Sequence, residues 1–215
     1  MEQFIQKFKN IKNQIHVLNS KVTLVAVTKG KDINTIKPII DEGHKDFGEN
    51  KVQEAVLKWH DILKVNNNIN LHLLGKLQSN KAEHAFKFFN FIHSLDSEKL
   101  AKIFSDLEKN SSRKIKYFIQ VNIGDEIQKN GINVQLLPEF INLCKKDLKL
   151  NILGLMCIPP ANESPIFYFK KLKELALKNN VQELSMGMSN DYIHAIECGS
   201  TFVRIGSSIF GPRSN

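Results

Sequence analysis

The segment Val22-Thr23-Leu24-Val25-Ala26-Val27-Thr28-Lys29 decides the fold that we predict for this chain. Its residues are apolar or β-branched and alternate only weakly, which is typical of a strand buried on both faces in a helix-covered parallel sheet. The segment ends abruptly on Lys29. This lysine is therefore expected at the carboxyl end of the strand, where parallel α/β folds bind ligands and carry out chemistry.

Lys29 is the first candidate for a functional residue. A lysine amine at the mouth of an apolar wall is partly desolvated, and desolvation favours its neutral, nucleophilic form. Lys29 could then capture an aldehyde as a Schiff base. The alternative from this segment alone is a strand-end lysine that reaches solvent, as most lysines do.

Strand-like and helix-like patterns alternate along the whole chain. Apolar residues at helical spacing predict an amphipathic helix over residues 4–18, ahead of the Lys29 strand. Further strands are predicted at residues 45–47, 70–74, 91–95, 115–123, 150–156, 183–186 and 201–205. Further helices are predicted at residues 33–40, 52–63, 81–89, 97–108, 136–146, 165–178 and 191–197. We expect Asp96 or Ser97 to cap the helix over 97–108, Gly199 to end the last helix, and Pro38 to lie in an early turn or to kink its helix.

Eight strands separated by helices favour an α/β fold with one (β/α)8 barrel of the TIM type and an extra N-terminal helix. The alternative is an open, doubly wound sheet. A length of 215 residues suits one domain over residues 1–215, since single α/β barrels run to roughly 200–250 residues. No linker, low-complexity tract or repeat argues for a second domain.

The formal net charge of +8 comes almost wholly from lysine, because the only arginines are Arg113, Arg204 and Arg213. Nucleic-acid surfaces use arginine for bidentate and stacking contacts. The lysines are spread over the polar faces of many predicted helices, so we expect a solvated surface rather than a nucleic-acid-binding one.

The cysteines and the N-terminus indicate the compartment. Cys144, Cys157 and Cys198 are odd in number and far apart, without the spacing of a zinc or redox motif, which favours core thiols in a reducing compartment. The N-terminal residues do not resemble a signal peptide, and no segment is apolar for long enough to span a bilayer. We therefore expect a cytoplasmic protein with no membrane partner.

Two loops near the end of the chain suggest a phosphate site. Ser185-Met186-Gly187-Met188-Ser189 and Val203-Arg204-Ile205-Gly206-Ser207-Ser208 contain and follow the seventh and eighth predicted strands, where barrels commonly hold phosphate. Glycine lets the backbone approach an anion, and serine hydroxyls add donors. Either loop alone is weak support, since small residues between a strand and a helix are common.

Arg204 lies between two apolar residues of the eighth predicted strand, in a chain with few arginines. A buried arginine must be given an acceptor. That acceptor is either a structural salt bridge or a heteroatom of a ligand.

A strand-end lysine, a phosphate pocket across the barrel closure and an inward arginine together suggest pyridoxal 5′-phosphate (PLP). The chain resembles the pyridoxal phosphate homeostasis protein family, and the resemblance extends over essentially its whole length. Six segments carry it: Ala26-Val27-Thr28-Lys29, Phe47-Gly48-Glu49-Asn50-Lys51-Val52-Gln53-Glu54, His72-Leu73-Leu74-Gly75-Lys76-Leu77-Gln78-Ser79-Asn80-Lys81, Ser185-Met186-Gly187-Met188-Ser189-Asn190-Asp191, Gly199-Ser200-Thr201 and Val203-Arg204-Ile205-Gly206-Ser207-Ser208-Ile209-Phe210-Gly211.

The resemblance implies a fold-type III barrel, similar to the N-terminal domain of alanine racemase, that binds PLP and has no established catalytic activity. By this resemblance Lys29 would form the internal aldimine and Arg204 would face the pyridine nitrogen. The remaining cofactor-binding positions that it implies are Ser189, Gly206 and Ser207 for the phosphate, and Ser185 and Asn50 along the pocket. Gly30 and Ser207 depart from the family, which often has threonine at both positions.

The expected function is to hold PLP and to take part in intracellular vitamin B6 homeostasis, with apo-PLP enzymes as expected recipients. An arginine opposite the pyridine nitrogen keeps that nitrogen unprotonated and weakens the ring as an electron sink. Racemisation also needs a second acid/base group, and none of Tyr117, Tyr168 and Tyr192 is expected near the site. A weak PLP-dependent amino-acid racemase or lyase is the alternative, and a nucleic-acid-binding module is a third. We expect a monomer.

The remaining polar motifs suggest no further site. The seven histidines lack a zinc-protease spacing, and we predict no metal site. His72 is expected in the barrel interior or at its rim. His93-Ser94-Leu95-Asp96 has the residue types of a catalytic triad on one strand, where they cannot converge. Lys129, in the loop over residues 126–131, is a candidate rim contact.

Overall fold

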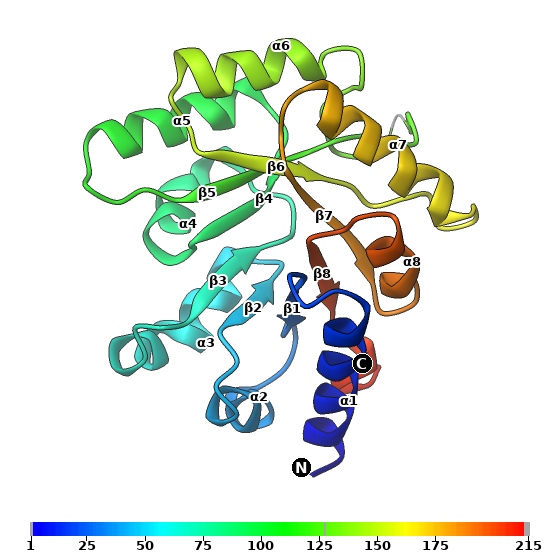
Figure 1. Cartoon of the computed structure of the whole chain (residues 1–215). Coiled ribbons are helices and arrows are strands. Elements are labelled where there is room, and N and C mark those ends of the chain that lie inside the picture. The colour runs from blue at the N-terminus through cyan, green and yellow to red at the C-terminus, as the bar shows by residue number, and fades with distance from the viewer. Residues whose placement is uncertain (1, 127, 213–215) are drawn as a thin grey trace.

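In the computed structural model of the chain, eight parallel strands close into a barrel in the order of the sequence (Figure 1). The structure describes residues 2–126 and 128–212. The strands are β1 (Thr23–Val27), β2 (Asp46–Glu49), β3 (Asn70–Leu73), β4 (Phe91–Leu95), β5 (Lys116–Gln120), β6 (Ile152–Met156), β7 (Glu183–Met188) and β8 (Phe202–Ile205). The barrel closes because β1 pairs with β8, with Val25 beside Arg204. The predicted (β/α)8 barrel is confirmed, and the open sheet is wrong.

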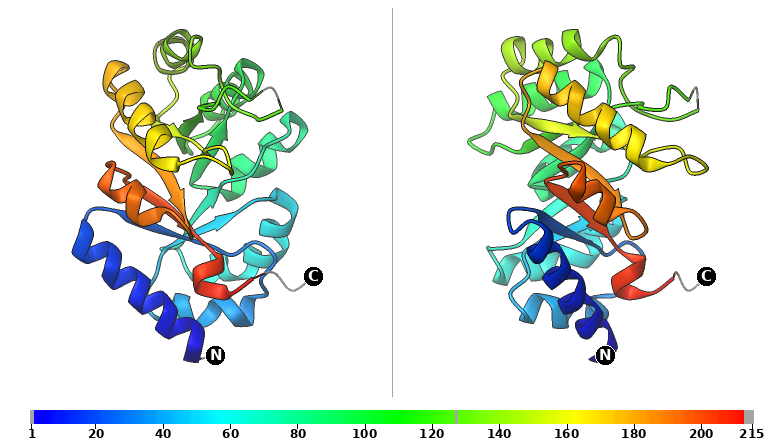
Figure 2. Two further views of the ribbon diagram at one scale, coloured as in Figure 1. Left: turned by 90° about the vertical axis from the view of Figure 1, so that its right-hand side faces the viewer. Right: turned by 45° about the vertical axis from the view of Figure 1, so that its right-hand side comes forward.

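Helices cover the outside of the barrel. They are α1 (Glu2–Leu18), α2 (Ile33–Asp41), α3 (Val52–Val65), α4 (Ala82–Phe88), α5 (Glu98–Lys109), α6 (Leu137–Asn142), α7 (Pro165–Lys178), α8 (Tyr192–Glu197) and α9 (Ser207–Phe210), with the short turns η1 (Ser79–Lys81) and η2 (Leu143–Asp147). The extra N-terminal helix α1 packs beside α8 and α9, at the seam where the barrel closes (Figure 2).

Local sequence signals explain where several helices begin and end. Ser97 caps α5, since its side chain accepts a hydrogen bond from the amide of Leu100. Gly199 follows α8 with a φ of +96°, a conformation that glycine adopts without strain. Pro38 lies inside α2, which continues to Asp41.

The helix predicted over residues 136–146 is present, because α6 and the π-helical segment η2 follow each other without a break from Leu137 to Asp147. α6 ends at Asn142, and the chain widens into the π-type turn η2. In this turn the amide of Leu148 donates to the carbonyl of Leu143, and Lys149 then takes a φ of +56°. This wider helical turn ends the helix, and Leu150, which follows it, is buried just before β6.

The barrel interior is filled by side chains rather than open. Phe91, Phe118 and Met156 form a separate buried cluster, with Leu153 and Phe202 packed against it. This cluster is distinct from the larger apolar core between the strands and the helices. A filled interior leaves the mouth at the carboxyl ends of the strands as the place for a ligand.

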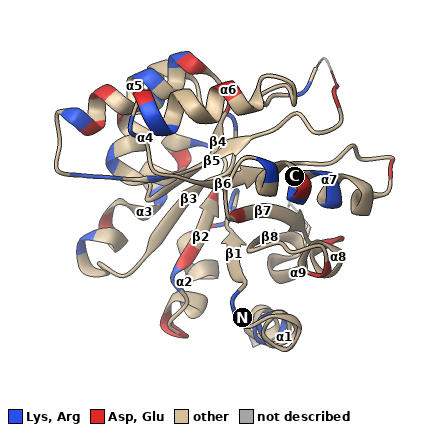
Figure 3. Cartoon of the chain, turned by 45° about the horizontal axis from the view of Figure 1, so that its top comes forward, with Lys and Arg blue, Asp and Glu red and all other residues tan. Residues whose placement is uncertain are grey.

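The surface carries acidic and basic side chains side by side on the outer helices (Figure 3). Many of these form ion pairs one helical turn apart, such as Lys37 with Asp41. All three cysteines are buried and unbridged. No helix within residues 2–126 and 128–212 could cross a membrane. Arg213 lies outside the described residues, as does part of the loop around Lys129.

Candidate functional site

A cavity of about 820 Å³ opens at the carboxyl end of the barrel. Its walls come from the ends of β1, β2, β3, β7 and β8, from the β6–α7 loop and from α9. Six of the seven cofactor-binding residues predicted from the sequence line it: Lys29, Asn50, Ser189, Arg204, Gly206 and Ser207. These residues are far apart in the chain, and barrel closure brings them together.

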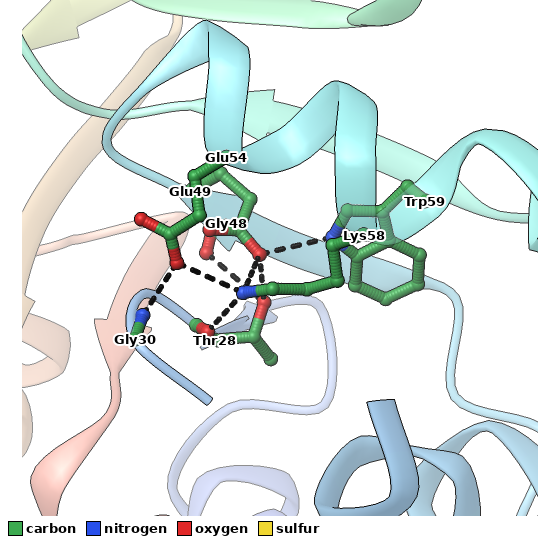
Figure 4. Close-up of polar contacts among 7 residues, drawn as sticks. All are labelled: Thr28, Gly30, Gly48, Glu49, Glu54, Lys58 and Trp59. Atoms are coloured by element: carbon green, nitrogen blue, oxygen red, sulfur yellow. Dashed lines mark hydrogen bonds and ion pairs between the residues drawn. The ribbon is translucent and has the colours of Figure 1, made fainter. Parts of the chain in front are cut away.

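Lys29 lies two residues after the end of β1, and its neighbours Thr28 and Gly30 are held by residues of α3 (Figure 4). On one side, the ammonium of Lys58 donates to the Thr28 carbonyl at 2.6 Å. On the other side, the amide of Gly30 donates to the Glu54 carboxylate at 2.5 Å. Gly30 takes a φ of +68°, which a glycine adopts without strain. The two contacts fix the turn that presents Lys29 to the cavity.

Glu49 is the centre of this network, and its side chain is completely buried. One oxygen, Oε1, accepts from the Thr28 hydroxyl at 2.6 Å, from Lys58 at 2.9 Å and from the Trp59 indole at 2.9 Å. Lys58 also contacts Glu54 at 3.1 Å. A buried carboxylate is stable only with such partners. The network therefore joins the turn that follows β1 to β2 and α3 (Figure 4).

Arg204 forms part of the cavity wall although only 5% of its surface is exposed. Its Nη1 donates to the Ser185 hydroxyl at 2.7 Å, and its Nη2 donates to the Cys157 carbonyl at 2.9 Å. Among the described residues Arg204 has no ion pair, so the predicted alternative of a structural salt bridge is wrong. A buried cation with neutral acceptors only is suited to a ligand that supplies a further acceptor.

The loops after β7 and β8 are joined to each other. The amide of Ser208 donates to the Ser189 hydroxyl, and the Ser208 hydroxyl donates to the Ser189 carbonyl, both at 3.3 Å. At Gly206 a Cβ atom would lie 3.1 Å from the Val27 carbonyl, so the backbone here runs close against β1. Ser207 then begins α9. These small residues leave room for an anion beside backbone amides and hydroxyls.

Ser185 is the one predicted site residue that does not line the cavity. It lies on β7 and is completely buried, and its hydroxyl meets Arg204 and the His93 ring. The family resemblance implied that Ser185 lies along the pocket, but its side chain points into the barrel. Ser185 therefore acts on the cavity only through Arg204.

Two further residues singled out in the sequence have clear positions. Lys129 lines the cavity rim, where its ammonium donates to the Pro159 carbonyl at 3.2 Å and pairs with Glu126 at 2.7 Å. His72 is buried in the barrel interior.

The three tyrosines, all in the described part of the chain, do not line the cavity. Their hydroxyls are hydrogen-bonded elsewhere: Tyr117 to Glu108, Tyr168 to Glu163 and Tyr192 to Gln14. Burial raises the pKa of Tyr117 far above its usual value, and the adjacent Glu108 carboxylate adds to the shift. The phenol of Tyr117 is therefore a structural donor.

The site includes residues that the sequence analysis did not single out. The supporting role of Lys58 and Glu54 was missed. A signal was available, because Glu49 lies two residues after the strand predicted over residues 45–47, and a carboxylate buried there needs a partner. The Cys157 carbonyl was missed as well, because a backbone acceptor leaves no mark in the sequence.

Comparison with known proteins places the chain in a family. The family model described as "Alanine racemase, N-terminal domain" matches residues 3–214. The pyridoxal phosphate homeostasis protein of Vibrio alginolyticus is 36% identical to this chain, and the match covers 99% of both chains. The chain belongs to the pyridoxal phosphate homeostasis protein family. The member of this family from Escherichia coli K12 is 35% identical over 90% of this chain and 86% of its own length.

Solved structures agree with this family assignment. PipY of Synechococcus elongatus, in a structure described as having PLP bound, is 32% identical, with a TM-score of 0.87 over 97% of this chain and 100% of that chain. The alanine racemase of Bartonella henselae has a TM-score of 0.76 over all of this chain and 61% of its own, at 16% identity. At that identity the racemase shows a shared barrel fold only, whereas PipY shares both the fold and the family.

Proposed function

We propose that this protein binds PLP covalently through Lys29 and takes part in keeping free PLP at a controlled level in the cell. The observation that carries the proposal is the single cavity that joins Lys29, Arg204 and the two serine-rich loops. A lysine for the aldehyde, a buried donor for the ring nitrogen and a cradle for the phosphate match three of the four polar groups of PLP. The PLP-bound relative PipY and the named function of the Vibrio and Escherichia relatives support the same reading.

In this proposal the Lys29 amine condenses with the PLP aldehyde and water leaves, which forms a carbon–nitrogen double bond. Arg204 donates toward the ring nitrogen through N–H groups that Ser185 and Cys157 do not use. Ser189, Gly206 and Ser207 would hold the phosphate, and Asn50 would line the pocket. Bound PLP supplies an electron sink for amino-acid chemistry, but an arginine at the ring nitrogen weakens that capacity.

The direct test is to add PLP to the purified protein, record the visible spectrum, and treat the sample with borohydride. Hydride from borohydride reduces the carbon–nitrogen double bond and makes the attachment permanent. We expect a yellow band that borohydride removes, and a phosphopyridoxyl group on the peptide that contains Lys29. A wild-type protein with no band, or a label on another lysine, would refute the proposed site.

Replacing Ser207 tests the phosphate cradle. We expect Ser207→Ala to weaken PLP binding about fivefold to tenfold, because one hydrogen bond to a charged group is lost. The measurement is the equilibrium dissociation constant for PLP, compared with that for pyridoxal, which lacks the phosphate. Ser164→Ala, at an exposed helix start, is the control. If Ser207→Ala weakened the binding of pyridoxal by the same factor as that of PLP, Ser207 would not act through the phosphate.

We propose a binding and homeostasis role rather than turnover on the named function of the Vibrio and Escherichia relatives. In the described part of the chain the cavity walls include no tyrosine, although Lys31, Lys129, Glu163 and Asp191 line them. A weak racemase or lyase activity is the alternative, and it would appear as turnover when the PLP-loaded protein is incubated with a panel of amino acids. Failure of any amino acid to react beyond the rate of free PLP would support the binding role.

We further propose one domain over residues 1–215, a monomeric state and a cytoplasmic location, with apo-PLP enzymes as the proteins that receive the cofactor. The single domain is supported by the one barrel, whose eight strands run from Thr23 to Ile205 along the chain. The buried, unbridged cysteines agree with a reducing compartment. Transfer of PLP from the PLP-loaded, unreduced protein to an apo-enzyme, followed by recovery of that enzyme's activity, is the test of delivery.

A further inference from the structure

A continuous row of hydrogen bonds crosses the barrel interior beneath Arg204. Arg204 Nη1 lies 2.7 Å from Ser185 Oγ, which lies 2.8 Å from His93 Nδ1. His93 Nε2 lies 3.0 Å from His72 Nδ1, and His72 Nε2 lies 3.1 Å from Asp46 Oδ1. We call these five residues the lumen chain. They come from β8, β7, β4, β3 and β2, so the chain crosses from one side of the barrel to the other.

The two ends of the lumen chain lie at opposite faces of the barrel. Arg204 lines the cavity at the carboxyl ends of the strands. Asp46 begins β2 and lines a second cavity, of about 550 Å³, between α1 and the amino ends of β1 and β2. Between them, Ser185, His93 and His72 are completely buried. The chain is therefore the polar connection between a basal carboxylate and the proposed cofactor site.

The end groups fix the direction of every hydrogen bond. A guanidinium can only donate and an ionised carboxylate can only accept. Ser185 therefore accepts from Arg204 and has one proton to give, which goes to His93 Nδ1. His93 then donates through Nε2 to His72 Nδ1, and His72 donates through Nε2 to Asp46.

The opposite direction fails at Asp46. If His93 donated to Ser185 through Nδ1, a neutral His93 would carry no proton on Nε2, and His72 would have to donate to it through Nδ1. A neutral His72 would then face the Asp46 carboxylate with a bare nitrogen, so two acceptors would lie 3.1 Å apart. Protonating the rings would relieve this, but burial lowers the pKa of both His72 and His93.

Aromatic rings surround the lumen chain. His72 stacks on Phe91 with ring centroids 4.2 Å apart, and His93 stacks on Phe118 at 4.4 Å. The Phe202 ring lies within 6.1 Å of both histidine rings. In such apolar surroundings hydrogen bonds are strong and polarise one another along a row. Each ring is also held in one orientation by its stacking partner.

The lumen chain does not deliver protons to the cofactor site. Such a path would require Arg204 to take up a proton from Ser185, and a guanidinium has no acceptor. The effect that the lumen chain transmits is electrostatic. The negative charge on Asp46 makes His72 Nδ1, then His93 Nδ1 and then Ser185 Oγ a stronger hydrogen-bond acceptor. The recipient of that effect is the Ser185 oxygen that holds Arg204.

We propose that Ser185, His93 and His72 are positioning residues for the cofactor: through the lumen chain they hold Arg204 in one orientation, as a donor toward the pyridine nitrogen of PLP. This inference rests on the proposed function, because it assigns the chain a role in PLP binding. It extends the PLP site through the barrel to Asp46.

The first test uses the protein without PLP. Nitrogen-15 NMR of the labelled histidine rings at pH 7 should show His93 and His72 neutral and protonated on Nε2. His72→Phe keeps the stacking on Phe91 but removes the hydrogen bond to His93 Nε2, so the lumen chain then stops at His93. In this variant the His93 ring should no longer be confined to the tautomer protonated on Nε2 and should populate both neutral tautomers. A wild-type His93 that carries its proton on Nδ1, or is charged, would overturn the inference whatever PLP does.

The second test uses PLP. Ser185→Ala should raise the dissociation constant for PLP about tenfold, which corresponds to about 1.4 kcal/mol. It should also shift the pH at which the visible band of bound PLP changes. His72→Phe should shift the same transition in the same direction by a smaller amount, although this residue does not line the PLP cavity. If the lumen chain only supported the fold, neither variant would change the pH of this transition.

Ser94→Ala is the matched control, because Ser94 is completely buried on β4 and its hydroxyl has no hydrogen-bond partner in the described structure. It should leave the PLP band, its pH transition and the histidine signals unchanged. Band and affinity changes of the same size in Ser94→Ala and Ser185→Ala would refute the positioning role. A wild type with the expected histidine signals but no PLP band would instead refute the proposed function, and the positioning role with it.

Discussion

The variant Lys29→Ala is expected to lose all covalently attached PLP while it keeps the barrel fold. Lys29 follows β1 at the cavity and is the residue proposed to form the bond to the aldehyde. After borohydride treatment, mass spectrometry should find about one phosphopyridoxyl group on each wild-type chain and none on the variant. The variant should still bind PLP weakly, since Arg204 and the loops after β7 and β8 remain.

Lys31→Ala is the control for this experiment. Lys31 lines the same cavity, but its ammonium donates to the Pro212 carbonyl at 3.3 Å. This variant should therefore keep the full covalent label. If the label persisted in Lys29→Ala and vanished in Lys31→Ala, the proposed attachment would belong to Lys31. Equal labelling of both variants would point to adventitious reaction of surface lysines.

The barrel could be predicted from the sequence because its signals are local and repeated. The β1 segment is apolar throughout, as a doubly buried strand must be, and the stretch over residues 91–95 was predicted with the bounds that β4 has. The change to π-type hydrogen bonding after Asn142 could not be predicted. Residues 136–146 keep a helical pattern and the backbone is helical to Asp147, but the pattern does not distinguish an α-helical from a π-helical turn.

The exposed part of the site was also predictable, because strand ends in a barrel meet at one mouth. That rule alone brings Lys29, Ser189 and Gly206 together. The rule does not say where a side chain within a strand points. The resemblance implied that Ser185 lies along the pocket, although its side chain faces the barrel interior and meets His93, 92 positions earlier in the chain. Such contacts depend on register across the barrel, which one sequence does not reveal.

The support beneath Lys29 should be as important to stability as Lys29 is to the chemistry. We expect Lys58→Met to lower the free energy of unfolding by about 3–5 kcal/mol, because it leaves the buried Glu49 carboxylate without its cation. Methionine fills similar space but donates nothing to Glu49, Glu54 or the Thr28 carbonyl. Urea unfolding followed by circular dichroism measures the loss.

Two comparisons decide whether the buried charge causes that loss. Lys37→Met removes an exposed ion pair with Asp41 one turn apart, so it should cost only about 0.3–0.5 kcal/mol. Adding Glu49→Gln to Lys58→Met removes both charges and should recover part of the lost stability, since the penalty comes from an unpaired buried charge. If the double variant is less stable than Lys58→Met alone, the hydrogen bonds that Glu49 accepts from Thr28 and Trp59, rather than its pairing with Lys58, hold the network together.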